Sequence, residues 1–140
     1  MDVNLLIALI DRAHAAHDLA HRWFSIHRSN GWSTCPIAEN GCLRILTNPK
    51  YSNPYSAEEV LRWLDNAKSD GFHEFWPDDL SVTGPNFQRS ALTGHQQVTD
   101  IYLLALAVSR SGRLVTFDTG ISLNAVAGAT AENLFVLPSR

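Results

Sequence analysis

Runs of strand length alternate with segments of helical spacing along the chain, and this alternation limits the folds that the chain can adopt. The expected strands are residues 31–35, 72–76, 113–117 and 133–137. The expected helices are residues 14–27, 36–47, 56–68, 99–111 and a shorter one at 123–127. Strands that alternate with helices imply parallel pairing with helices on both faces of a sheet. The expected fold is therefore α/β, a three-layer α/β/α sandwich with a central parallel sheet.

Length and composition are those of one globular domain, which we expect to span residues 1–140. The chain is 45% hydrophobic and 18% charged. No stretch approaches the roughly 20 apolar residues of a membrane span, and no signal peptide is recognisable. Cys35 and Cys42 lack the spacing of a zinc site and are too few for a disulfide framework. We expect free thiols, a cytoplasmic location and no membrane association.

Four carboxylates lie at the edges of apolar runs, where a solvated charge is not normally found. They are Asp2, Glu39, Asp100 and Asp118. A lone charge beside a core is costly unless it is paired or bound to a metal, and four charges of one sign cannot neutralise one another. If the fold brings the four together, a hard divalent cation such as Mg²⁺ or Mn²⁺ would satisfy them.

Helical spacing places two of these carboxylates on apolar faces. The neighbours of Glu39 at this spacing are Cys42, Leu43 and Leu46, and those of Asp100 are Leu103, Leu104 and Ala107. A solvated acid would instead share its face with polar residues.

Three of the four carboxylates also have a purely structural interpretation. Asp2 could cap the apolar segment 3–10. Asp100 could interact with a helix dipole, with Thr99 as the cap. Asp118 could form a turn before Gly120. It is the occurrence of all four in one chain that favours a metal site, because parallel sheets bind ligands at the carboxyl ends of their strands.

The net charge neither supports nor excludes a nucleic-acid substrate. It is −3, from 14 acidic and 11 basic residues. Without the four carboxylates above, 10 acids would remain against the 11 bases. The rest of the surface is then nearly neutral, and a bound cation would itself attract phosphate.

Four segments of the chain together resemble the PIN domain. They are residues 2–7, 39–49, 99–107 and 114–118, in that order. They are most similar to the VapC-type toxins of bacterial toxin–antitoxin pairs. The resemblance implies a parallel α/β/α sandwich and an endoribonuclease that depends on Mg²⁺ or Mn²⁺. It also implies a VapB-type antitoxin partner, a transfer or ribosomal RNA substrate, and a homodimer.

By this resemblance Asp2, Glu39, Asp100 and Asp118 match the acidic quartet of the family. Asp2 and Asp100 are the expected direct metal ligands, and the other two would complete the site directly or through water. Three neighbours of the quartet could orient ligands or waters: Asn4, Thr99 and Thr116. Arg44 could pair with a carboxylate, contact phosphate, or be an ordinary surface residue.

One feature departs from the family pattern. Several apolar residues usually precede the first Asp and form a central strand, but here only Met1 precedes Asp2. We expect this strand to be very short, or the native start codon to lie upstream.

Other signals are weaker. His14, His17 and His21 share a helix face, which we interpret as solvated and opposite a buried stripe of Leu19, Trp23 and Ile26, rather than as a zinc site. A receiver domain would need a late Lys, which is missing. An RNA-processing PIN nuclease outside a toxin–antitoxin pair and a catalytically silent PIN binding module stay open.

Overall fold

The computed structural model describes residues 1–138, which divide into two compact units. The first unit contains Met1 and residues 3–77, and the second contains Asp2 and residues 78–138. Each unit combines helices with a pair of parallel strands. The predicted α/β class with parallel pairing is therefore confirmed, while the prediction of a single domain over residues 1–140 stays a prediction.

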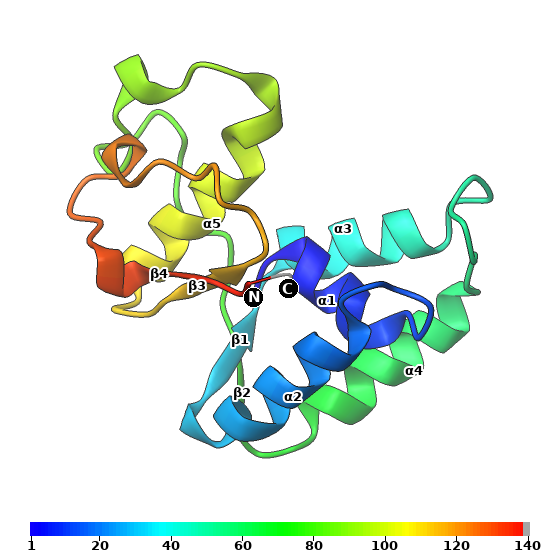
Figure 1. Cartoon of the computed structure of the whole chain (residues 1–140). Coiled ribbons are helices and arrows are strands. Elements are labelled where there is room, and N and C mark those ends of the chain that lie inside the picture. Colours follow the sequence, from blue (N-terminus) through cyan, green and yellow to red (C-terminus); the bar gives the residue numbers. More distant parts are fainter. Residues whose placement is uncertain (139–140) are drawn as a thin grey trace. The chain divides into compact units, whose positions relative to one another are not determined.

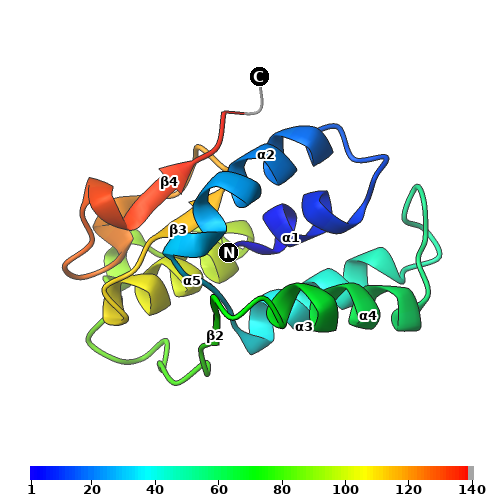
Figure 2. The same ribbon diagram turned by 90° about the horizontal axis from the view of Figure 1, so that it is seen from below.

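The first unit consists of four helices and one strand pair. Its elements are α1 (Val3–Ile10), α2 (His17–His27), β1 (Trp32–Thr34), α3 (Pro36–Leu46), α4 (Ala57–Lys68) and β2 (His73–Phe75). Strands β1 and β2 lie side by side, with Trp32 opposite His73 (Figure 1). Helix α1 packs against α2 and α3, and α3 packs against α4 (Figure 2).

The second unit is built on one long helix and the other strand pair. Its elements are α5 (Val98–Ser109), β3 (Leu114–Thr116) and β4 (Leu134–Val136), joined by short 3₁₀ turns. Strand β3 pairs with β4 in parallel, with Leu114 opposite Leu134 (Figure 1). All residues from 101 to 107 of α5 are buried, as the run of apolar residues in this segment predicts.

Two local sequence signals mark helix starts in the first unit. Ser56 and Glu59 form a capping box at the start of α4, with Ser56 Oγ accepting from Glu59 N at 3.2 Å. Pro36 opens α3 as its first residue. The α1–α3 contact depends on a glycine, because a Cβ at Gly41 would lie 3.0 Å from Val3 Cγ2.

The expected buried stripe of α2 is wrong. The helix begins at His17 and buries Ala20 and Phe24, whereas Ile26 is 71% exposed. His17 Nδ1 and His21 Nε2 lie 2.8 Å and 2.7 Å from the carbonyl oxygens of Ala8 and Leu9. These carbonyls belong to the last turn of α1 and have no partner within that helix. The histidine face therefore packs and satisfies a helix end, and is not solvated.

Two further expectations need correction. The helical spacing of Val60, Leu61 and Leu64 predicts that all three are buried in α4, but Leu61 is 47% exposed. Thr99 does not cap α5, which begins one residue earlier at Val98. Gly112 N does donate to Ala107 O at 2.8 Å at the end of this helix, but the residue with positive φ there is Ser111.

The first segment of the chain is not a strand within the described residues. Helix α1 begins directly at Val3, and Asp2 makes a single strand-like contact, from its N–H to Val115 O at 3.1 Å. The very short strand that we expect is thus reduced to this one backbone hydrogen bond. This bond also places Asp2 beside β3 in the second unit.

Candidate active site

Asp2 is held in the second unit by a buried threonine. The Asp2 side chain is 2% exposed and Thr116, the last residue of β3, is fully buried. Thr116 Oγ1 donates to Asp2 Oδ2 at 2.7 Å. The same hydroxyl accepts from the backbone N–H of Asp118 at 3.0 Å. Thr116 thus joins two of the predicted site residues, which lie far apart in the sequence.

Asp118 follows β3 in an exposed turn. Its Oδ1 accepts from Gly120 N at 2.7 Å, so it also makes the turn contact expected of an Asp at this position. This contact uses one carboxylate oxygen and leaves the group its charge.

Asp100 lies in the first turn of α5 and interacts with both of these acids. Burial, the negative charges of Asp2 and Asp118, and a side-chain interaction with Asp118 together raise the pKa of Asp100 to about 6, with burial contributing most. Three of the four predicted acids therefore converge in the second unit as an acidic trio of Asp2, Asp100 and Asp118.

The donor chemistry of the trio suits a hard divalent cation. Within residues 1–138, no three His, Cys, Asp or Glu side chains are already arranged as a metal-binding group. All donors of the trio are carboxylate oxygens, which Mg²⁺ and Mn²⁺ prefer. The repulsion that helps to raise the pKa of Asp100 is the repulsion that a bound cation would relieve. The donor atoms of the trio, though not their arrangement, therefore suit the cation that the resemblance implies.

Glu39, the fourth predicted acid, lies in the first unit and has partners there. Thr34 Oγ1 donates to Glu39 Oε1 at 2.6 Å, and Lys68 Nζ lies 2.8 Å from the same oxygen. His73 Nε2 lies 2.7 Å from Thr34 Oγ1. The four side chains come from α3, β1, α4 and β2, and we call them the Glu39 network.

Sequence analysis missed the partners of Glu39. Thr34 and His73 become neighbours only because β1 and β2 pair in parallel, with Trp32 opposite His73. A register between strands so far apart in the sequence cannot be read from local patterns.

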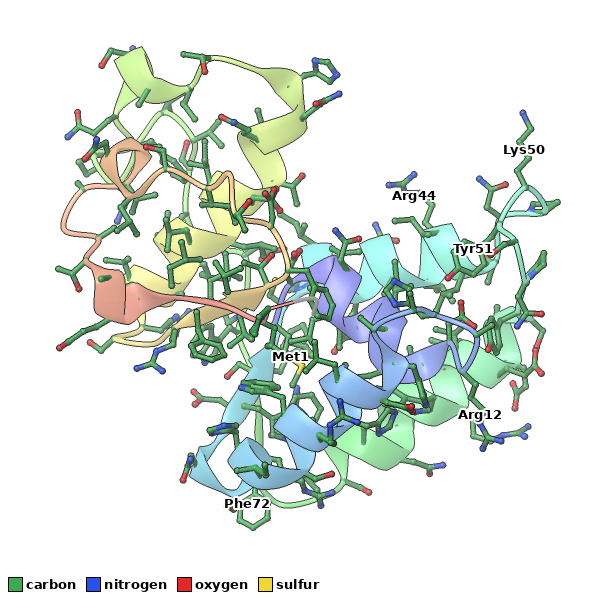
Figure 3. All side chains as sticks on the ribbon, in the orientation of Figure 1. Met1, Arg12, Arg44, Lys50, Tyr51 and Phe72 are labelled. Atoms are coloured by element: carbon green, nitrogen blue, oxygen red, sulfur yellow. The ribbon has the colours of Figure 1, made fainter. Side chains whose placement is uncertain are left out.

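Three predicted site residues lie on the surface. Asn4, Thr99 and Arg44 are exposed, and Arg44 projects outward from α3 (Figure 3). Arg44 forms no ion pair with any acid of residues 1–138. Of the residues expected to orient ligands, Thr116 is the one that contacts a site carboxylate.

Cys35 and Cys42 are both buried thiols. Burial and the nearby charge of Glu39 raise the pKa of Cys42 to about 12. Cys42 is therefore a neutral thiol at physiological pH and not a nucleophile.

A second buried acid, outside the predicted site, lies just after α1. Asp11 is 2% exposed and accepts from Tyr51 Oη at 2.5 Å, Ala13 N at 3.0 Å and Tyr55 Oη at 3.2 Å. Figure 3 labels Tyr51 near the C-terminal end of α3, in the loop that carries Lys50. Asp11 thus ties the α3–α4 loop to the end of α1.

Comparison with known proteins identifies the family. The chain is 43% identical to Ribonuclease VapC44 of Mycobacterium tuberculosis over 138 residues, which cover 98% of this chain and 97% of the relative. It is 42% identical to Ribonuclease VapC39 of the same organism over 130 residues, covering 91% and 94% of the two chains. No protein-family profile matches the chain. The chain belongs to the VapC family, which confirms its resemblance to the VapC-type PIN-domain toxins.

The helices can be compared with the requirements of a membrane span. Of the helices in the described part of the chain, none combines the length and the apolar character that crossing a membrane requires.

Proposed function

We propose that this protein is a metal-dependent endoribonuclease and the toxin of a VapBC-type toxin–antitoxin pair. The observation that carries the proposal is the convergence of Asp2, Asp100 and Asp118, with Thr116 bonded to both Asp2 and Asp118. The ribonuclease names of the relatives support the same reaction class.

In this proposal Asp2 and Asp100 are the direct ligands of Mg²⁺ or Mn²⁺, and Asp118 completes the site directly or through water. Glu39 joins the site on the resemblance alone. When bound, the cation lowers the pKa of a coordinated water and stabilises charge on the scissile phosphate. The products are then a 5′-phosphate and a 3′-hydroxyl.

The protein's own residues prepare this chemistry. Thr116 holds Asp2 through one oxygen, at 2.7 Å, and fixes the start of the Asp118 turn. A buried, β-branched threonine has few rotamers, so it keeps two acids of the trio in place. The raised pKa of Asp100 means that a cation bound beside it would favour the ionised carboxylate.

The first test is cleavage of total bacterial RNA by the purified protein with Mg²⁺, with Mn²⁺ and with EDTA. We expect discrete fragments that require metal, with 5′-phosphates detected by end mapping. Asp100→Asn should abolish them. Asp79→Asn is the matched control, because it removes an exposed acid of the same unit that pairs with Arg110 at 2.8 Å. Cleavage that continues in EDTA would contradict the metal mechanism.

The toxin role needs a separate test in cells. We propose a VapB-type antitoxin as the partner, a cytoplasmic location, and a homodimer. Induced expression should stop growth, Asp100→Asn should relieve the arrest, and co-expression of a small protein encoded next to the gene should also relieve it. A purified enzyme that cleaves RNA but does not affect growth would favour an RNA-processing role instead.

A further inference from the structure

Hydrogen-bonding chemistry fixes which side chains of the Glu39 network donate and which accept. A carboxylate can only accept, so the single proton of the Thr34 hydroxyl is donated to Glu39 Oε1 at 2.6 Å. The Thr34 oxygen can then only accept from His73, whose Nε2 lies 2.7 Å away. His73 therefore carries its proton on Nε2. The chain of donors runs from His73 through Thr34 to Glu39.

The two side chains that contact Glu39 directly, Thr34 and Lys68, both reach the same carboxylate oxygen. Lys68 Nζ reaches the same Oε1, at 2.8 Å. Two donors on Oε1 fix the carboxylate plane and leave Oε2 as the oxygen that neither Thr34 nor Lys68 engages. A carboxylate held in this way presents one oriented oxygen to a ligand.

Thr34 is the more rigid of the two donors. Its side chain is 1% exposed, and it is β-branched and lies in β1. Lys68 reaches Glu39 with a long side chain that is 28% exposed and has more rotamers than a threonine. The hydroxyl of Thr34, backed by His73, is therefore the main constraint on Glu39.

We propose that Thr34 and His73 are positioning residues for Glu39, which act through Oε1 so that Oε2 serves the metal-dependent reaction. This inference rests on the proposed function, in which Glu39 belongs to the metal site. Neither Thr34 nor His73 contacts the metal or the RNA in this proposal. Their effect passes through Glu39.

The decisive experiment is a double-mutant cycle between Thr34→Val and Glu39→Gln. Valine keeps the shape of threonine and removes the hydroxyl. Loss of a partner behind a metal ligand typically costs about 10–100-fold in affinity or activity, so we expect Thr34→Val to weaken Mn²⁺ binding about tenfold in calorimetric titration. It should lower kcat for RNA cleavage by a similar factor and leave KM nearly unchanged. The double variant should be no worse than Glu39→Gln alone.

Three further variants make the result specific. Thr34→Ser retains the hydroxyl and should restore Mn²⁺ affinity and kcat. His73→Phe should fall between wild type and Thr34→Val. Thr47→Val is the matched control, because Thr47 Oγ1 donates to Leu43 O at 2.7 Å at the end of the same helix as Glu39. It should bind Mn²⁺ like the wild type.

Additive effects of Thr34→Val and Glu39→Gln on Mn²⁺ affinity would overturn the inference, and so would a failure of Thr34→Ser to restore it. If Glu39→Gln itself binds Mn²⁺ and cleaves RNA normally, there is nothing to position, and the inference is wrong although the nuclease stands. If the wild type cleaves no RNA in any metal, the proposed function fails, while the Mn²⁺ binding cycle still decides the role of Thr34.

Discussion

Asp11 and Asp100 are both acids set against apolar helices, yet their surroundings shift their pKa values in opposite directions. Burial alone would raise the pKa of Asp11, but hydrogen bonds from Tyr51, Ala13 and Tyr55 outweigh it, and the net pKa is lowered. Burial raises the pKa of Asp100, and the charges of Asp2 and Asp118 add to the rise. The groups that face a buried acid, more than its burial, distinguish a structural acid from a functional one.

Asp11 and Asp100 therefore have different roles. Asp11 has donors on both oxygens, so its charge is already satisfied by the protein. Asp100 faces two other acids, so its charge is satisfied only by a proton or a cation.

The largest difference should appear in metal binding. We expect Asp100→Asn to weaken Mn²⁺ binding by more than about a hundredfold, beyond the loss typical of partners behind a ligand. Asp11→Asn should bind Mn²⁺ as the wild type does, although it also removes one buried negative charge. Calorimetric titration of both variants measures the difference directly. Equal losses in the two variants would mean that net charge, not the trio, attracts the cation.

For the free energy of unfolding, we expect the larger loss when Asp11 is replaced and the smaller loss when Asp100 is replaced. Asp11→Ala leaves the hydroxyls of Tyr51 and Tyr55 without their acceptor, and an unsatisfied buried polar group costs about 1–3 kcal/mol. We expect a loss of about 2 kcal/mol in the free energy of unfolding, measured by urea denaturation in EDTA. Asp100→Ala should lose less, because it also removes repulsion from Asp2 and Asp118. A larger loss for Asp100→Ala than for Asp11→Ala would contradict the comparison.

The sequence indicated Asp100 and missed Asp11 for a physical reason. Asp100 interrupts an apolar pattern at helical spacing, which is a local signal. Asp11 follows the last residue of α1 and precedes Arg12, a position typical of a solvated helix end. Its two tyrosine donors come from a loop about 40 residues later, so only the tertiary structure reveals its burial.

For the fold, as for the acids, local sequence signals predict the elements but not the contacts between them. Strands β1 to β4 and helices α3 and α4 lie within the expected ranges, and α5 begins one residue before its range, because each element has a local period and a terminal signal. The packed face of α2 could not be predicted, because it depends on the carbonyl groups at the end of α1. The Glu39 network was missed likewise, since its members come from four elements.

A smaller effect separates the two tyrosines that bind Asp11. The Tyr51 hydroxyl lies 2.5 Å from the carboxylate and that of Tyr55 lies 3.2 Å from it. Hydrogen bonds to charged groups contribute about 1.5–3 kcal/mol and weaken with distance. Tyr51→Phe should therefore lower the free energy of unfolding by about 1.5 kcal/mol and Tyr55→Phe by less. Urea denaturation of the two variants at neutral pH tests this order, and the reverse order would contradict it.

The smallest effect is a pH dependence of opposite sign at the two acids. The folded pKa of Asp100, about 6, is above its ordinary value of 3.8, so the folded protein holds this proton more tightly than the unfolded chain. The contribution of Asp100 to stability is therefore fully present below pH 3.8 and is lost as the pH rises through 6. Asp100→Asn should be more stable than the wild type at pH 7.5 in EDTA, and this advantage should shrink as the pH falls from 7.5 to 5.

The lowered pKa of Asp11 has the opposite consequence: its stabilisation is present above pH 3.8 and is lost only in stronger acid. Asp11→Asn should therefore be less stable than the wild type at both pH values. Thermal unfolding of the three proteins at pH 5 and 7.5 measures both signs. A lower melting temperature for Asp100→Asn than for the wild type at pH 7.5 would show that the charge of Asp100 is already satisfied within the fold, as that of Asp11 is.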